Sequence, residues 1–347
     1  MSTRRRVDMR AGQLTLRWEF AIHPPMAGVA PAEPTIASQL TRAVQRLAYY
    51  LAGARRQILP ARMMRKRTEA LRAAFETHPE REALEHRARY YMKIQNSFAP
   101  QGPCRGDIPF KHSRYFFDFM EHALGFPEKA QFDPLFGDVI YVPDTPRLVK
   151  SRPLTEDNQN GVLFPFDKFR HFLTLDDPQP FRDKKPTAVW RGAMHSVERI
   201  VLVHRHAQHK DHDIGHTGPV YEGVQPKGFL TPRDQIKHKY LLSVEGIDVA
   251  TNLKWMMGTN CLVMSPPLRF ESWYMEGALE PSKHFVELAP DFSDLDEKIE
   301  FYNSNPDAAE TIIAAAQAWR RSFNDAQREA MVVARVLDLY LEYSNQS

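Results

Sequence analysis

The chain has 347 residues, 43% of them hydrophobic, and a formal net charge of +3. This length and hydrophobic content exclude a disordered chain and are sufficient for two domains with buried cores. The two cysteines, Cys104 and Cys261, lie far apart, which excludes a disulfide framework or a cysteine-based metal site. No stretch approaches the roughly 18 consecutive apolar residues of a membrane-spanning helix, and the first thirty residues contain no apolar core of a signal peptide, so we expect a cytoplasmic protein.

Positive charge is concentrated at the amino-terminal end. Residues 1–72 contain 14 Lys and Arg but only 4 Asp and Glu, so the remainder of the chain is net negative. Such a basic surface attracts anionic lipid headgroups, a phosphorylated glycolipid or nucleic acid, and it is equally consistent with a solvated helix surface. The basic positions form no recognisable nucleic-acid motif with aromatic residues, so we expect no nucleic-acid partner.

Residues 1–110 are expected to form a basic, mostly helical region packed on the first domain. A proline-rich stretch over 23–34 follows one candidate strand at 14–18. Apolar residues at helical spacing predict a helix over 41–52 that extends through 59–67, and then one or two helices over 68–95 with a break near Pro79. The helix over 41–52 is basic and amphipathic, and two interpretations stay open: peripheral contact with a membrane, or a cover over its own domain's core.

Residues 111–185 read as the first α/β domain, and residues 186–322 as the second. In the first, we predict a helix over 111–124 and strands over 138–142 and 162–166. In the second, we predict a strand over 187–190, a helix over 196–206 and a polar loop over 207–231. Strands over 240–244, 261–264 and 285–286, with a helix over 251–257, then give a β-α-β-α-β rhythm. A parallel sheet of this kind binds anions at the carboxyl ends of its strands, so we expect a phosphate near the loop 245–252.

The carboxyl-terminal part is expected to be helical. The residues Ser293 to Asp296 resemble a capping box that opens a helix through Tyr302, and a second helix starts behind Pro306 and continues to about Trp319. Residues 323–347 are predicted to contain one long final helix. The fold class from periodicity alone is α/β with two domains.

Two stretches of the second domain resemble a known family. The sequences KYLLSVEGIDVATNLKW (239–255) and FESWYMEGAL (270–279) are similar to the signature of glycosyltransferase family 90, in its bacterial lipopolysaccharide-biosynthesis branch, which is related to eukaryotic protein O-glucosyltransferases. The resemblance runs from about Arg114 to about Trp319. It implies a GT-B-like fold of two facing Rossmann-like domains, in which the carboxyl-terminal half holds a nucleotide sugar without a metal or other cofactor.

Sugar transfer from a nucleotide donor requires a base for the acceptor hydroxyl and positive charge or amide dipoles for the departing diphosphate. One carboxylate suffices, because a nucleoside diphosphate leaves already ionised. The resemblance implies Asp144 as the base, since Ile140 to Pro146 is similar in spacing to the family's strand and turn. Residue types alone also allow a turn aspartate that binds its own backbone, and Asp138 is the nearby competitor.

The donor site implied by the resemblance spans the second domain. Arg199 would approach the diphosphate, and Gly192 would let the backbone come close to the donor. Asn252 departs from the arginine of the eukaryotic members, which leaves the charge balance of the diphosphate open. Glu245 and Asp248 either accept hydrogen bonds from ribose or sugar hydroxyls or cap the following helix. The full set of predicted donor-binding residues is Arg191, Gly192, Arg199, Glu245, Gly246, Asp248, Asn252, Lys254, Glu271, Trp273 and Glu276.

Basic residues at the edge of the first domain are candidates for an anionic acceptor, with a solvated rim as the alternative; they are Lys150, Arg152, Lys168 and Arg170. A run of histidines with two aspartates suggests metal binding, but its loop-like spacing differs from that of known zinc helices, so we predict no metal there. The run contains His204, His206, His209, His212 and His216.

These observations lead to one preferred function and two alternatives. We expect an inverting, metal-independent glycosyltransferase that moves a sugar from a nucleotide sugar, expected to be UDP-linked, to a lipopolysaccharide core or a related cell-surface glycan. It would work at the inner face of the plasma membrane, as a cytoplasmic or peripheral protein. The alternatives are a protein or capsule O-glycosyltransferase, and an inactive nucleotide-sugar-binding protein recruited to a membrane.

Overall fold

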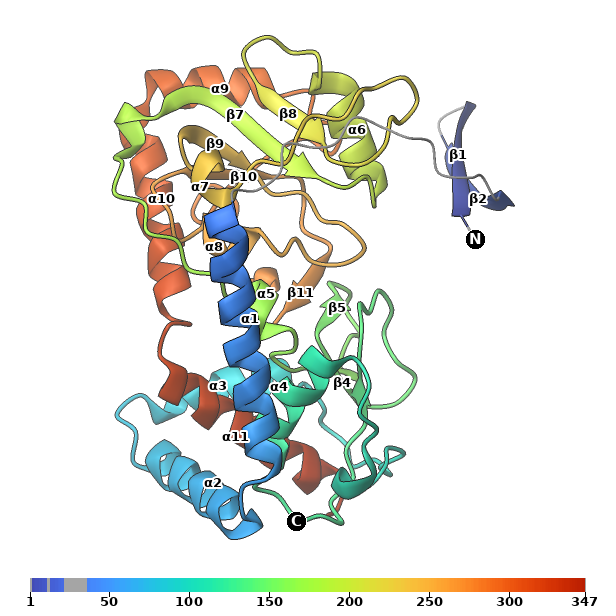
Figure 1. Ribbon diagram of the computed structural model, residues 1–347, viewed down its shortest axis with the longest axis vertical. Helices are drawn as coiled ribbons and strands as arrows, with labels where there is room; N and C mark the ends of the chain where they lie inside the picture. The colour runs from blue at the N-terminus through green and yellow to red at the C-terminus, as the bar shows by residue number, and fades with distance from the viewer. Residues whose placement is uncertain (1, 11–12, 22–35, 347) are drawn as a thin grey trace.

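The structure is a computed structural model that describes residues 2–10, 13–21 and 36–346 (Figure 1). The first described residues form an antiparallel pair, β1 (Ser2–Arg10) and β2 (Gln13–Ala21). The predicted strand over 14–18 is confirmed, because it lies inside β2. The proline-rich stretch over 23–34 lies outside the described residues.

Four helices form the amino-terminal part of the body, but the predicted extension of the first helix through 59–67 is wrong, because that helix ends at Gln57 and a new helix begins at Ala61 behind Pro60. The four helices are α1 (Ile36–Gln57), α2 (Ala61–Glu76), α3 (Arg81–Tyr91) and α4 (Ser113–Ala123). The predicted break near Pro79 is confirmed, because α2 ends and α3 begins on either side of it. Gly125 follows α4 and lies against α2: a Cβ at Gly125 would come within 1.9 Å of the Thr68 hydroxyl.

A small parallel sheet follows these helices. It has the order β3-β4-β6, with β3 (Pro134–Leu135), β4 (Arg147–Val149) and β6 (Gly161–Leu163). The strand predicted over 138–142 is wrong, because those residues form an irregular loop. Ile140 and Tyr141 are more than half exposed, whereas Leu148 in β4 is fully buried. A central strand needs burial on both faces, which 138–142 does not have.

The second half contains a five-stranded, all-parallel sheet in the order β12-β10-β9-β7-β8. Its strands are β7 (Lys185–Gly192), β8 (Asp213–His216), β9 (His238–Leu242), β10 (Leu262–Ser265) and β12 (Val286–Glu287). Its helices are α6 (Val197–His206), α7 (Pro232–Gln235), α8 (Leu253–Met256), α9 (Leu295–Ser304) and α10 (Pro306–Arg321). The predicted parallel sheet is thus confirmed.

Three details of this half differ from expectation. The predicted polar loop over 207–231 contains the edge strand β8, whose Ile214 is fully buried. The second helix of the β-α-β-α-β rhythm is absent from the described structure between β10 and β12, where strand β11 (Phe270–Ser272) and a single 3-10 turn, η3 (Glu276–Ala278), occur instead. The capping box is not formed: Asp294 accepts a hydrogen bond from the Ala289 N–H at 2.9 Å, and α9 begins at Leu295.

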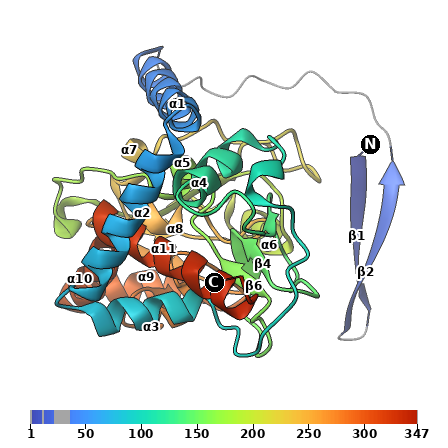
Figure 2. The ribbon, with the colours of Figure 1, turned by 90° about the horizontal axis from the view of Figure 1, so that it is seen from below.

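The last helix, α11 (Ala326–Tyr343), returns to the amino-terminal helices and packs on α2 and α3 (Figure 2). Asp325 caps it by accepting hydrogen bonds from the N–H groups of Gln327 and Arg328. Four arginine–carboxylate pairs hold it in place: Arg87 with Glu329, Arg72 with Asp338, Arg335 with Glu85 and Arg328 with Glu80. In the part of the chain that the structure describes, no helix is both long and apolar enough to span a membrane.

The two sheets are joined by one antiparallel ladder. Strand β5 (Ser151–Pro153) comes directly after β4, and it pairs with β11, which follows β10 of the large sheet. Arg152 lies opposite Glu271 in this ladder. Both side chains are completely buried, so the connection between the two halves contains an ion pair shielded from solvent.

Candidate functional site

The edges at which the parallel strands of both sheets end lie against each other. In the small sheet, Asp138 follows β3, Lys150 follows β4 and Asp167 follows β6. In the large sheet, the loop after β9 carries Asp248. The Asp248 carboxylate accepts a hydrogen bond from the Ser151 hydroxyl at 2.6 Å and pairs with the Lys150 ammonium at 2.7 Å. Ligands of parallel sheets bind at such carboxyl ends, so this contact marks the candidate site.

Lys150 is the centre of a three-charge group. Its ammonium is 3% exposed and contacts the carboxylates of both Asp138 and Asp248. Asp138 is the accessible member, with a side chain 33% exposed, and the Tyr115 hydroxyl lies 3.4 Å from it. Burial alone would raise the pKa of Asp138, but the hydrogen bond and charge of Lys150 lower it below the ordinary value. Asp138 is therefore ionised and able to accept a proton.

Arg199 provides positive charge at the carboxyl edge of the large sheet. It lies in α6, the helix that follows β7, and its guanidinium donates to the carbonyl oxygens of Ala193, Val244 and Glu245. Among the described residues, no carboxylate forms an ion pair with it. Burial lowers the pKa of Arg199 to about 10, which still leaves it charged at neutral pH. A fixed cation held only by main-chain oxygens can bind an anion.

Two glycines surround Arg199, as expected, but for different reasons. A Cβ at Gly246 would lie 3.0 Å from the Arg199 guanidinium, so the glycine lets the loop cover the arginine closely. A Cβ at Gly192 would lie 2.6 Å from the Trp190 indole, which itself lies against Arg199. Gly192 is the last residue of β7 and makes room for an aromatic ring, whereas the predicted role was close approach to the donor.

Glu245 and Asp248 fasten their loop to other elements. The Glu245 carboxylate accepts hydrogen bonds from the N–H groups of Arg269 and Phe270, both at 3.1 Å. Burial raises the pKa of Glu245 to about 7 despite these donors. The alternative that these two acids cap the following helix is wrong, because the bonds of Glu245 lead to the segment before β11 and those of Asp248 to Lys150 and to Ser151 at the start of β5.

Several predicted donor-site residues form ion pairs within the protein. Lys254 and Glu276 lie 2.7 Å apart and are each 1% exposed. Arg191 pairs with Asp213 at 2.6 Å and so holds β7 to β8. Asn252 is half-buried immediately before α8. In this structure Lys254 is paired with Glu276 and Arg191 with Asp213, so neither side chain offers an unpaired positive charge to a ligand.

Two further predictions fall on the ladder between the sheets. The Trp273 ring stacks on Tyr91 at a centroid distance of 3.8 Å, and its indole N–H donates to Glu329 at 2.6 Å. Glu271 binds Arg152 at 2.7 Å and also accepts a hydrogen bond from the Tyr90 hydroxyl. Glu271, Trp273 and Arg152 are buried and connect the two halves, so Arg152 is not part of an open acceptor rim.

The remaining basic predictions lie around Asp167. Arg170 is 47% exposed and bonds to Asp167 at 3.2 Å, and Arg114, which sequence reasoning missed, bonds to the same carboxylate at 3.0 Å. Lys168 pairs with Glu121 at 3.0 Å. Lys168 and Arg170 belong to the short helix α5 (Lys168–His171), which follows β6 at the same edge as Lys150. These cations remain partly accessible.

Asp144 lies apart from this group. It precedes β4 by three residues and is exposed, and the side-chain amide of Asn160 donates to its carbonyl oxygen at 3.0 Å. Asn160 immediately precedes β6, so both residues lie at the amino-terminal edge of the small sheet. The structure thus brings Asp138, and not Asp144, beside Lys150 and Asp248.

The histidine run gathers at one point, where His209 and His212 stack 4.5 Å apart beside Asp296. The Nδ1 atoms of His212 and His209 accept hydrogen bonds from the N–H groups of Ala188 and Asp211, at 3.3 and 3.2 Å. The Nε2 atoms of both rings face Asp296: that of His212 lies 2.9 Å from the carboxylate, within hydrogen-bond distance, and that of His209 lies 3.6 Å from it. The absence of a metal at this group stays a prediction.

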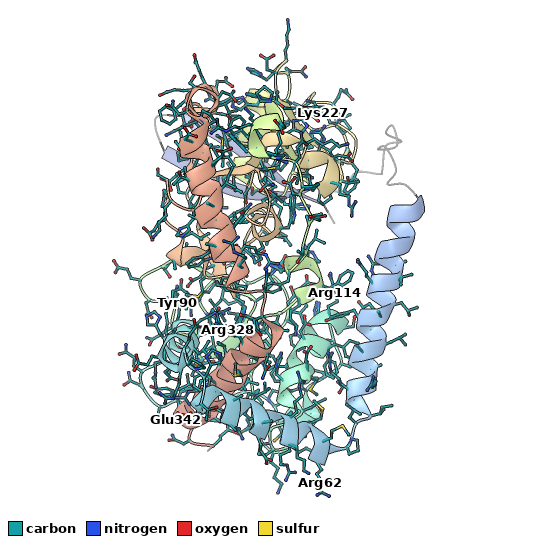
Figure 3. The ribbon with its side chains drawn as sticks, turned by 90° about the vertical axis from the view of Figure 1, so that its left-hand side faces the viewer. Arg62, Tyr90, Arg114, Lys227, Arg328 and Glu342 are labelled. Carbon is teal, nitrogen blue, oxygen red and sulfur yellow. The ribbon has the colours of Figure 1, made fainter. Side chains whose placement is uncertain are left out.

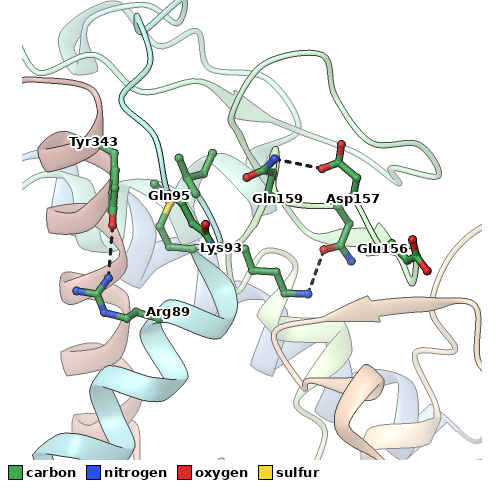
Figure 4. A pocket seen from close by; sticks show the side chains of 10 residues that line it. Arg89, Lys93, Gln95, Glu156, Asp157, Gln159 and Tyr343 are labelled. Atoms are coloured by element: carbon green, nitrogen blue, oxygen red, sulfur yellow. Dashed lines mark hydrogen bonds between the residues drawn. The ribbon is translucent and has the colours of Figure 1, made fainter.

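A pocket of about 610 Å³ opens between the end of α3 and the loop over 154–160 (Figure 4). Lys93 lies at its centre and bonds to Asn158 at 3.0 Å, and Tyr343 of α11 closes one side. Glu156, Asp157 and Gln159 add polar groups. Its lining comes from three distant segments with no common motif, so sequence reasoning missed it.

Two kinds of comparison of the sequence with known proteins give matches. The sequence profile of the family described as Glycosyl transferase family 90 matches residues 164–345, which include the whole large sheet and α11. The chain is 38% identical over 302 residues to the O-glucosyltransferase LpsA of Dichelobacter nodosus, and this match covers 85% of the chain and 95% of the relative.

A more distant similarity extends to animal proteins. The chain is 29% identical over 170 residues to protein O-glucosyltransferase 3 of Homo sapiens, a match that covers 46% of the chain and 32% of that protein. The counterpart in Rattus norvegicus is 28% identical over the same length. With the family profile covering more than half of the chain and a relative aligned over most of its length, the chain belongs to glycosyltransferase family 90 and is a glycosyltransferase.

Proposed function

We propose that this enzyme is an inverting, metal-independent O-glucosyltransferase that uses a nucleotide sugar, UDP-linked in our proposal, and acts on a lipopolysaccharide core. The observation that carries the proposal is Arg199, a cation at the carboxyl edge of a parallel sheet whose hydrogen bonds go to main-chain oxygens only. A diphosphate is the anion that such a position suits. The name of the bacterial relative, O-glucosyltransferase LpsA, supports the sugar and the acceptor class.

In this proposal the protein has a GT-B-like arrangement, with residues 111–185 and 186–322 as two facing domains. The donor lies between the two carboxyl edges, with its diphosphate near Arg199 and the amino-terminal end of α6. Two observations support this: the edges meet at Lys150 and Asp248, and α6 begins directly after β7 with its N–H groups directed toward the same edge.

For the reaction, we assign the base to Asp138 in place of Asp144. The acceptor hydroxyl oxygen attacks the anomeric carbon, the bond from that carbon to the diphosphate oxygen breaks, and the hydroxyl proton passes to the Asp138 carboxylate. The nucleoside diphosphate leaves as an anion, and Arg199 stabilises the charge that develops on it. When Asp138 takes up the proton, Lys150 keeps Asp248 as its partner, so no buried cation is left unpaired.

The acceptor is proposed to approach past α5. Arg114 and Arg170 share the single buried carboxylate of Asp167, so this edge keeps an excess of positive charge for phosphates or acidic sugars of the acceptor. Such an acceptor is lipid-linked, and we place the enzyme at the inner face of the plasma membrane. The partial similarity to protein O-glucosyltransferase 3 supports a second candidate, a protein acceptor.

The proposal is tested by a donor panel. Wild type and the variants Asp138→Asn and Asp144→Asn are each incubated with UDP-, GDP- and ADP-glucose and lipopolysaccharide acceptors, with and without EDTA, and nucleotide release and product anomer are measured. We expect EDTA-resistant release from UDP-glucose by wild type and Asp144→Asn, with an inverted anomer. A retained anomer, or loss of activity only in Asp144→Asn, would contradict the assignment.

A further inference from the structure

Helix α1 has two apolar faces, which is unusual for a helix at the surface of a protein. One face packs on α4: the Tyr49 hydroxyl bonds to Asp118 at 2.8 Å, and a Cβ at Gly53 would come within 2.6 Å of the Phe117 ring. Arg56 adds an ion pair with Glu121 at 3.3 Å. This inner face is sufficient to hold α1 on the body, so a second apolar face is not needed for folding.

The second face points away from the body. Val44, Leu47 and Leu51 are 58%, 59% and 60% exposed, and Ile58, just beyond the end of the helix, is 83% exposed. With about 100° of rotation per residue, these positions lie on the side of α1 opposite Gly53. Figure 3 shows α1 along one flank of the molecule, with its outer side uncovered. Isolated exposed apolar residues are ordinary, but a continuous stripe on one helix indicates a binding surface.

The surroundings of this stripe are strongly basic. No Asp or Glu occurs from Ile36 to Thr68, a stretch that contains eight Lys and Arg. Arg46, Arg55, Arg62 and Lys66 are exposed around the stripe, and Met63 extends the apolar surface onto α2 at 53% exposure. Figure 3 shows Arg62 at the end of the molecule where α1 turns into α2.

We propose that the outer face of α1 docks on an anionic lipid bilayer, with Val44, Leu47, Leu51 and Ile58 in the interface and the surrounding arginines on the lipid headgroups. An apolar stripe bordered by cations without any acid matches both layers of such a surface. A second copy of this chain does not match as well, because it would bring two equally cationic stretches together.

The position of α1 connects this surface with the acceptor side of the enzyme. Its inner face contacts α4 and α5: the Tyr49 and Phe169 rings lie 5.7 Å apart, and Arg56 and Lys168 share Glu121. A bilayer bound to α1 therefore lies next to Arg170, where we place the acceptor. This last point rests on the proposed function, whereas membrane docking itself does not.

The test is co-sedimentation of the full-length protein with vesicles of phosphatidylcholine alone or of phosphatidylcholine mixed with the anionic lipid phosphatidylglycerol, in the absence of donor and acceptor. We expect binding to the anionic vesicles only, weakened by salt. The double variant Leu47→Ser/Leu51→Ser should bind about tenfold more weakly, and Arg62→Glu/Lys66→Glu should lose the preference for anionic lipid.

Two controls are matched in exposure and lie elsewhere on the surface. Phe301→Ser removes an aromatic ring that is 52% exposed in α9, and Lys210→Glu reverses an exposed charge between α6 and β8. Both should bind vesicles like the wild type.

The proposal is overturned if the wild type does not bind anionic vesicles, or if the two serine substitutions leave binding unchanged. It is also overturned if sedimentation velocity shows a lipid-independent dimer that those substitutions dissociate. Because no sugar is transferred in this assay, its failure would leave the proposed reaction untouched.

Discussion

The buried pair of Arg152 and Glu271 provides the strongest test of how the two halves are held together. In Arg152→Met, the Glu271 carboxylate, which has no exposed surface, would lose a cation at 2.7 Å and keep only the more distant Lys93 at 3.6 Å. The carbonyl oxygens of Tyr90 and Gly161 would each lose a donor at 2.8 Å as well. Removing one partner of a buried pair costs about 3–5 kcal/mol, and we expect this variant to lose at least that much free energy of unfolding.

Urea denaturation followed by fluorescence measures this loss, and a double-mutant cycle isolates the pair. Adding Glu271→Gln to Arg152→Met removes the stranded charge, so the double variant should be more stable than Arg152→Met alone, by about 2 kcal/mol. Arg182→Met removes an exposed arginine that pairs with Asp307 and Glu310, and it should leave stability unchanged within error. The reasoning is refuted if Arg152→Met costs less than about 1 kcal/mol, or if the two substitutions are simply additive.

Three further predictions concern the site. Asp138→Asn should lower kcat by about 100-fold or more, because a base is lost, and it should keep the thermal stabilisation by the donor. Asp144→Asn should have a kcat close to that of the wild type. The opposite pattern would restore Asp144 as the base. Arg199→Met should weaken binding of UDP and UDP-glucose by about tenfold or more in calorimetry, since a charge-assisted contact is lost. The control is Arg205→Met on the same helix; Arg205 pairs with Asp291 at the surface, so this variant should bind both ligands like the wild type. Equal affinity in both variants would remove Arg199 from the diphosphate site. Burial raises the pKa of Glu245 from 4.5 to about 7, so the folded state favours its protonated form, and ionisation destabilises the fold progressively from pH 4.5 to above 7, by up to about 3 kcal/mol. Glu245→Gln should therefore gain stability relative to wild type as the pH rises from 5 to 8, and a pH-independent difference in melting temperature would count against a raised pKa.

Local pattern was sufficient to predict the large sheet and the long helices. Runs such as Tyr240 to Leu242 and Leu262 to Met264 are short and apolar, and they form buried parallel strands. The strand predicted over 138–142 had the same local appearance. The difference is burial: Ile140 and Tyr141 are more than half exposed, and a single run of residues does not show which runs other elements will cover.

The site was harder to predict for a related reason. Residue types identified the charged groups, but not which of them neutralise each other. Lys254 and Glu276 are 22 positions apart, and Arg152 and Glu271 are 119 positions apart, yet both pairs are internal. Arg199 differs from them only in that its neighbours are main-chain oxygens. Asp138 and Asp144 are six positions apart and lie at opposite edges of one sheet, because the loop that joins the parallel strands β3 and β4 crosses from one edge to the other.

The ladder of β5 and β11 limits how the two halves can move. It is the place where strands attached to different sheets are hydrogen-bonded, and a slip by one residue would separate Arg152 from Glu271 and turn each side chain to the other face. Sliding along the ladder would break this pairing, whereas a small rotation about the ladder would keep its register. Ser151, at its start, contacts Asp248 across the boundary, so the groups that we propose for the reaction lie close to this axis. A rotation that opens the outer parts of the two sheets by many ångströms would displace Asp138 and Asp248 very little, and the chemistry would keep its alignment while substrates enter and leave.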